Sequence, residues 1–146
     1  MQVEIIDRPF ALNLYGFSDI ALNKDYAGKA FQLMDKMWRA VKENELKNKG
    51  INIWVYESNE KVFAGVELLN PPANAETIME HKPVTLVKYA YYKHIGPYRL
   101  IKNAGQKMNE VLKEKGIVTC LPYIEIYGHW TNDENKLETE LLFSIK

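Results

Sequence analysis

Cysteine is almost absent from this sequence: its 146 residues include only Cys120, so no disulfide can form within the chain. A chain without internal disulfides suits a reducing compartment, and we expect a cytoplasmic protein. The N-terminus has no basic segment followed by an apolar run, so the sequence predicts no signal peptide. No apolar run approaches the ~20 residues that span a bilayer, and no membrane partner is expected.

An excess of charge is missing as well, because 19 basic residues balance 19 acidic ones. Proteins that bind nucleic acids usually carry a basic patch or a basic arm. The lysines of this chain are dispersed instead of clustered. The charge balance therefore argues against nucleic acid as a partner.

Metal-binding and phosphate-binding motifs are also lacking. The three histidines, His81, His94 and His129, have no metal-ligand spacing with one another or with Cys120, so no metal site is expected. Neither a P-loop nor a dinucleotide-binding glycine pattern occurs. We therefore predict a protein without a cofactor.

Apolar and aromatic residues are plentiful by contrast, at 47% and 12% of the chain, enough for the core of one domain. In the first half, residues 10–16 read as a strand, and apolar residues recur at helical spacing within 24–49. Two strands follow, at 52–56 and 62–69. The apolar stripe of this first helix comprises Ala27, Ala30, Phe31, Met34, Met37, Trp38 and Val41.

The second half repeats this order of elements. A proline-rich stretch at 71–83 without periodicity predicts a linker, and residues 84–94 read as one strand. A helix is expected at 97–115, followed by strands at 123–127 and 137–145. The pattern predicts an α+β fold of tandem pseudo-symmetric βαββ repeats, with antiparallel sheets backed by two helices.

The strand "PYIEIY" raises a chemical question. Period-two alternation places Tyr123, Glu125 and Tyr127 on one face and the two isoleucines on the other. An unpaired buried carboxylate costs several kcal/mol. Glu125 is therefore either a half-exposed carboxylate paired with a lysine, or a negative charge on an aromatic wall that receives a cation or acts as a base. Spacing alone leaves these two interpretations equal.

Other aromatic residues are candidates for the same wall. Trp54 and Tyr56 share one face of their strand, as Tyr89 and Tyr91 do, and Trp130 follows Glu125 closely. If the two halves face each other, these strands line one cleft with Glu125. A shift of one residue in register would reverse each assignment.

Several short motifs resemble the GyrI-like small-molecule-binding domain, which is also the effector-binding domain of some AraC- and MerR-type bacterial regulators. Their order covers nearly the whole chain as one domain, with repeat one at about 1–70 and repeat two at about 84–146. The motifs are the opening "VEIIDRPFALNLYG", His94-x-Gly96-Pro97-Tyr98, Gly116-Ile117, Glu125-x-Tyr127 and Phe143-Ser144-Ile145.

The resemblance implies a ligand cleft between the repeats and a pocket glutamate, Glu125, beside Tyr127. It favours a stand-alone bacterial protein that binds amphipathic, cationic or aromatic compounds, as drug-sensing members do. Because the chain begins at the opening strand, without the upstream DNA-binding domain of the regulators, we expect no direct DNA binding. Where relatives often have Asp-Pro, this chain has Gly128-His129-Trp130, which leaves the loop's shape open.

Two alternatives remain. Some stand-alone members of that family resemble hydrolases of strained electrophilic natural products, in which case Glu125 is the catalytic residue. The third hypothesis is a protein-interaction module, such as a gyrase modulator, and a protein partner or a homodimer stays open. The ligand-binding residues that we predict are Glu125, Tyr127, Tyr91, Trp54, Tyr56 and Trp130.

Overall fold

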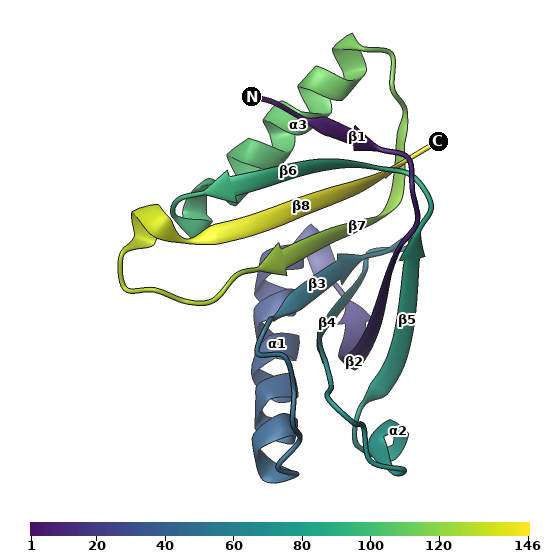
Figure 1. Ribbon diagram of the computed structural model, residues 1–146, viewed down its shortest axis with the longest axis vertical. Helices are drawn as coiled ribbons and strands as arrows, with labels where there is room; N and C mark the ends of the chain where they lie inside the picture. The colour runs from purple at the N-terminus through teal and green to yellow at the C-terminus, as the bar shows by residue number, and fades with distance from the viewer.

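All eight strands join in a single antiparallel sheet in the computed structural model, which describes residues 1–146 (Figure 1). The strands are β1 (Glu4–Ile6), β2 (Phe10–Ile20), β3 (Ile53–Tyr56), β4 (Lys61–Glu67), β5 (Glu80–Leu86), β6 (Tyr89–Ile95), β7 (Thr119–Tyr127) and β8 (Glu138–Ile145). The helices are α1 (Tyr26–Glu43), α2 (Ala75–Ile78) and α3 (Ile101–Glu114), with 3-10 turns η1 (Leu22–Lys24), η2 (Tyr98–Leu100) and η3 (Glu134–Lys136).

The order of the strands reads the same from either edge of the sheet when equivalent strands of the two repeats are exchanged. Along the chain, β1-β2-α1-β3-β4 is followed by β5-β6-α3-β7-β8, and across the sheet the order is β1-β6-β8-β7-β3-β4-β2-β5. An approximate two-fold axis between β3 and β7 requires this arrangement. The predicted α+β class with tandem pseudo-symmetric repeats is confirmed. Each repeat also has a first strand, β1 or β5, that pairs with the other repeat at the outer edge of the sheet.

Three boundaries differ from the sequence-based expectation. The single strand expected at 84–94 is two strands, because the chain bends at 87–88 between β5 and β6. The stretch expected to be an irregular linker contains α2 and the start of β5. Helix α1 ends at Glu43 and not near residue 49, because the Asn44 side chain caps the Ala40 carbonyl and Glu45 adopts a left-handed φ of 51°.

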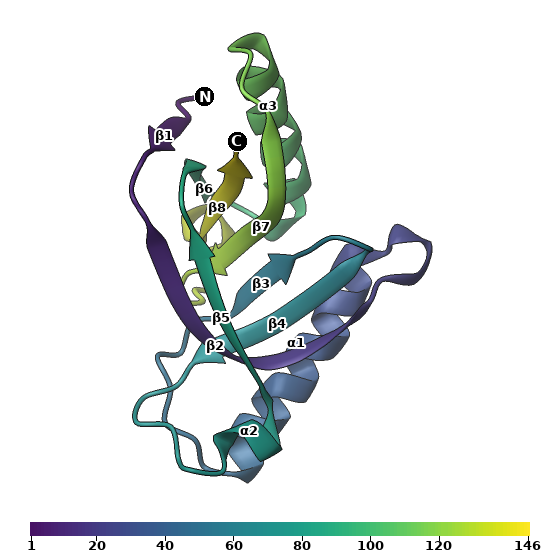
Figure 2. The same ribbon diagram turned by 90° about the vertical axis from the view of Figure 1, so that its right-hand side faces the viewer.

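Both long helices cover the same face of the sheet. Helix α1 packs on the β2–β4 half and α3 on the β6–β8 half, and the sheet bends sharply between the halves (Figure 2). The helix-free face is buried where the sheet curls over itself, so that β2 and β5 contribute to one core with β7 and β8. None of the helices combines the length and the apolar character that a membrane span requires. Helices α1 and α3 thus lie on the same face of the sheet, on either side of the central strands β3 and β7.

Candidate functional site

The two central strands place a carboxylate between aromatic rings. In the antiparallel register of β3 and β7, Trp54 lies opposite Glu125, and Tyr56 lies opposite Tyr123. Alternation brings these side chains and Tyr127 to the face that carries the helices. Glu125 is thus held on regular strands at the centre of the sheet.

A cleft of about 1120 Å³ opens over this strand pair. Its floor comes from β3 and β7, one wall comes from α1, and the other comes from α3. Ring pairs cross the floor from α1 to η2: Phe31 with Trp54 at 5.4 Å, Trp54 with Tyr127 at 4.8 Å, and Tyr127 with Tyr98 at 5.5 Å between centroids. An aromatic lining with a few polar groups is typical of small-molecule sites.

The Glu125 carboxylate is bound on one oxygen only. The Tyr56 hydroxyl donates to Oε1 at 2.6 Å, and the Tyr127 hydroxyl donates to the same atom at 2.8 Å. No lysine, arginine or histidine pairs with Glu125, and its Oε2 accepts no hydrogen bond and is not sealed from solvent. Oε2 is therefore available to an incoming group.

Burial shifts the protonation equilibria of this cluster. Loss of hydration raises the pKa of Glu125 above its ordinary value of 4.5, and the hydrogen bonds from Tyr56 and Tyr127 offset part of that shift. Burial and the neighbouring carboxylate raise the pKa of both tyrosines, so their hydroxyls stay protonated as donors. No group of three or more His, Cys, Asp or Glu side chains that could hold a metal ion is found.

The raised pKa of Glu125 predicts a stability cost in the free protein. The folded-state pKa lies above the unfolded value, so ionisation favours the unfolded state as pH rises through this range. Glu125→Gln should increase the free energy of unfolding at pH 7 by about 0.5–2 kcal/mol, and this gain should vanish below the ordinary carboxyl pKa. Urea denaturation of both proteins, at pH 7 and at a pH below the ordinary carboxyl pKa, measures these free energies of unfolding. Equal or lower stability of the variant at pH 7 would contradict the prediction.

A second prediction concerns the hydrogen bond from Tyr56. Tyr56→Phe removes one of the two donors to Oε1, so the pKa of Glu125 should rise further and the protein should lose about 1 kcal/mol of stability. Titration of the ¹³C-labelled carboxyl group by NMR reports the pKa. Tyr91→Phe is the matched control, since its hydroxyl donates to Glu140 at 2.6 Å. An identical Glu125 titration curve in Tyr56→Phe would be inconsistent with the role assigned to this hydrogen bond.

Five of the six side chains singled out from the sequence line this cleft: Glu125, Tyr127, Trp54, Tyr56 and Trp130. Tyr91 does not. Tyr91 pairs with Leu142, which pairs with Ile124, so all three side chains point to the opposite face of the sheet from Glu125. The expectation that Tyr91 lines the cleft is therefore wrong.

Sequence reasoning missed the walls of the cleft. Phe31, Met34 and Trp38 belong to the apolar stripe predicted for the first helix, yet they line the cleft, and Phe31 is 53% exposed. The α3 residues at the cleft, among them Lys102 and Asn109, have no apolar periodicity to mark them. The width of the stripe on α1, broader than its buried core residues need, was the available signal.

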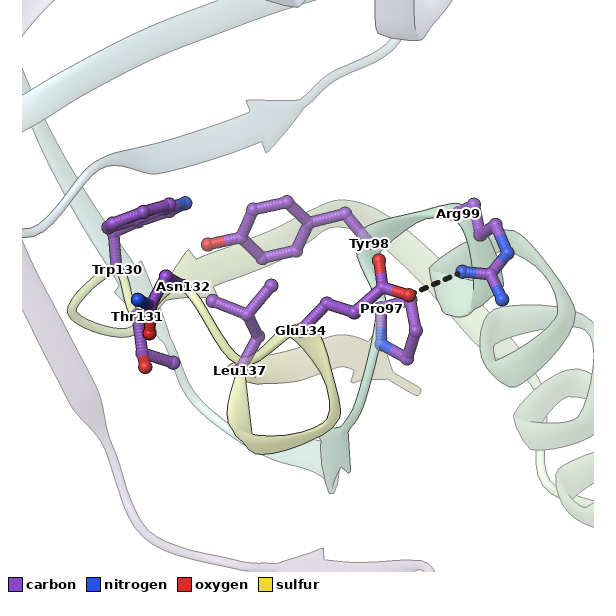
Figure 3. A pocket seen from close by; sticks show the side chains of 8 residues that line it. All are labelled: Pro97, Tyr98, Arg99, Trp130, Thr131, Asn132, Glu134 and Leu137. Atoms are coloured by element: carbon purple, nitrogen blue, oxygen red, sulfur yellow. Dashed lines mark hydrogen bonds and ion pairs between the residues drawn. The ribbon is translucent and has the colours of Figure 1, made fainter.

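A smaller hollow of about 430 Å³ adjoins the cleft at its rim (Figure 3). The loop after β7 forms one side of it, and η2 forms the other side. Trp130 and Tyr98 line both the hollow and the cleft, and an ion pair of 3.4 Å between Arg99 and Glu134 ties the loop to η2. Trp130 is 75% exposed, so the loop that departs from the GyrI-like motif adds an aromatic side chain to the rim.

Comparison with known proteins identifies the fold. No protein-family model matches the chain, and no curated protein matches it in sequence. The crystal structure of the EcmrR C-terminal domain has a TM-score of 0.76 at 14% identity, over 99% of this chain and 97% of that domain. The chain has the fold of this domain.

Two further structures share the fold. SAV2435, solved with bound tetraphenylphosphonium, has a TM-score of 0.62 at 16% identity, over 100% of this chain and 94% of that protein. A protein of Listeria innocua described as a hydrolase has a TM-score of 0.55 at 13% identity, over 99% of this chain and 92% of that protein. At these identities the likeness extends to the fold alone.

Proposed function

We propose that this chain is a GyrI-like small-molecule-binding domain that takes cationic aromatic compounds into the cleft between α1 and α3. The observation that carries the proposal is the Glu125 carboxylate, which lies on an aromatic floor without a cationic partner and with Oε2 free. The open cleft favours ligand binding over a protein-interaction module, for which a filled cleft would be expected.

Physical reasons support a positively charged ligand. A carboxylate removed from water without a counter-charge is destabilised, and a bound cation restores the missing partner. The faces of Trp54, Tyr56 and Tyr127 also attract cations through their quadrupoles. SAV2435, which has the same fold, was solved with the cation tetraphenylphosphonium.

Two ions of matched shape and opposite charge test this proposal. Tetraphenylphosphonium and tetraphenylborate have nearly the same size and apolar surface, so isothermal titration of both isolates the effect of charge. We expect the phosphonium ion to bind and the borate ion to bind at least tenfold more weakly. Equal affinities, or tighter binding of the borate ion, would rule out a cation site.

A hydrolase that uses the same cleft is the second candidate. Oε2 of Glu125 can accept a proton from the attacking water, and the protonated carboxyl group can then return that proton to the leaving group. The observation that favours this alternative is that a Listeria innocua protein of this fold is described as a hydrolase. Glu125→Gln separates the two functions, because it should weaken cation binding by a receptor but slow turnover by an enzyme.

A further inference from the structure

The cleft lies across the pseudo-two-fold axis, so each position in one wall has a counterpart in the other. The helix ends Glu43 and Glu114 are separated by the same number of residues as Tyr56 and Tyr127, the last residues of β3 and β7. The same spacing relates Trp54 to Glu125. The two tyrosines that donate to Glu125 are therefore equivalent residues of the two repeats, and only one repeat supplies the acceptor.

The two walls occupy equivalent positions but differ in chemistry. The same spacing relates each apolar α1 side chain at the cleft to a polar or small residue of α3 that also lines it. The equivalent pairs are Phe31 with Lys102, Met34 with Gly105, and Trp38 with Asn109. Gln106 adds a further amide to the α3 wall. One side of the cleft is thus apolar and aromatic, and the other side offers hydrogen-bond donors.

Lys102 is the charge on the α3 wall that lacks a partner. It is exposed and forms no ion pair, whereas the carboxylates near the cleft mouth are engaged elsewhere. The engaged pairs are Glu57 with Lys82, Glu134 with Arg99, and Asp25 with the Gly28 amide. The other unpaired cation of the cleft, Lys24, belongs to η1 at the start of α1. An anionic group bound at α3 would find Lys102 free.

We propose that the preferred ligand is zwitterionic: a cationic aromatic body with an acidic arm, held in one orientation. The cationic centre faces Glu125, the aromatic body lies against Phe31, Met34 and Trp38, and the carboxylate arm lies along α3. There it accepts hydrogen bonds from Lys102, Gln106 and Asn109. This inference rests on the proposed cation site and adds to it the chemistry of the opposite end of the ligand.

Rhodamine B and its ethyl ester form a matched pair for the test. Both have the same cationic xanthene body, and only rhodamine B has a free carboxylate at neutral pH. Fluorescence anisotropy should give a dissociation constant roughly fivefold lower for rhodamine B than for the ester, the scale of one exposed ion pair with hydrogen bonds. In Lys102→Ala the ratio of the two constants should fall to near one, and Lys102→Arg should restore most of it.

Two further variants test where the carboxylate arm of the ligand binds. Lys107→Ala removes another exposed α3 lysine, one that does not line the cleft, so the native ratio should persist. A collapse of the ratio in Lys24→Ala, with Lys102→Ala unaffected, would overturn the orientation. Ester binding that depends on Glu125, without any preference for rhodamine B, would overturn the acidic arm and leave the cation site standing. Failure of both dyes to bind would contradict both proposals.

Discussion

Glu125→Gln is expected to weaken the binding of tetraphenylphosphonium by about 1–3 kcal/mol, or roughly 5- to 150-fold. The amide keeps the shape of the side chain and can still accept from the hydroxyls of Tyr56 and Tyr127, so the floor of the cleft should persist. Only the negative charge is lost. Neutral aromatic compounds should lose much less affinity, because stacking on Tyr127 and Trp130 remains. Isothermal titration of cationic and neutral compounds measures the difference.

Glu140→Gln is the matched control for this substitution. Glu140 also accepts a hydrogen bond from a tyrosine, Tyr91, but it does not line the cleft. The control should therefore bind tetraphenylphosphonium as the native protein does. Equal losses in both variants would mean that the effect is a general change in charge and that Glu125 has no special role.

The same variant tests the hydrolase hypothesis. If the chain turns over a strained electrophile with Glu125 as the base, Glu125→Gln should leave substrate binding largely intact and slow turnover by about 10²–10⁴-fold. Incubation of each bound compound with native protein, followed by mass spectrometry, detects product. Turnover that disappears in the variant would replace the receptor interpretation with an enzymatic one.

Cation binding should also depend on pH in a range set by Glu125. A cation prefers the ionised carboxylate, so its affinity is full above the raised pKa of Glu125 and falls as the pH drops through that value. Below that pKa, the dissociation constant should increase about tenfold for each unit by which the pH falls, until it reaches the dissociation constant of Glu125→Gln. Because burial raises the pKa, the fall should begin at a higher pH than for an ordinary glutamate.

Titrations with tetraphenylphosphonium at a series of pH values measure this profile, since its charge does not change with pH. Glu125→Gln should give a flat profile over the same range. A native profile that is equally flat down to the ordinary carboxyl pKa would show that no carboxylate with a raised pKa contributes to binding.

Alternation along a single strand predicted correctly which side chains of β7 share one face. It placed Tyr123, Glu125 and Tyr127 on one face, and the structure has them there. Alternation cannot, however, relate the faces of strands that are far apart in sequence, because the phase depends on the pairing register. That is why Trp54 lines the cleft and Tyr91 does not.

Other features had no signal in a single sequence. The bend at 87–88 interrupts a run of strand-forming residues that has no glycine or proline at the break. The apolar stripe of α1 was found, but periodicity cannot separate side chains that pack in a core from those that line an open cleft. Phe31 belongs to this stripe, and it lines the α1 wall of the cleft.

The first strand of each repeat, β1 or β5, pairs with the other repeat, and this pairing limits how a ligand can enter the cleft. Because β1 pairs with β6 and β5 pairs with β2, the chain crosses between the halves at both ends of the sheet. Separation of the two repeats would break both of these ladders together with the central β3–β7 pairing. We therefore expect the two repeats to unfold as one cooperative unit. We also expect a ligand to enter through rearrangement of side chains and of the loop at the mouth of the cleft, where Trp130 lies.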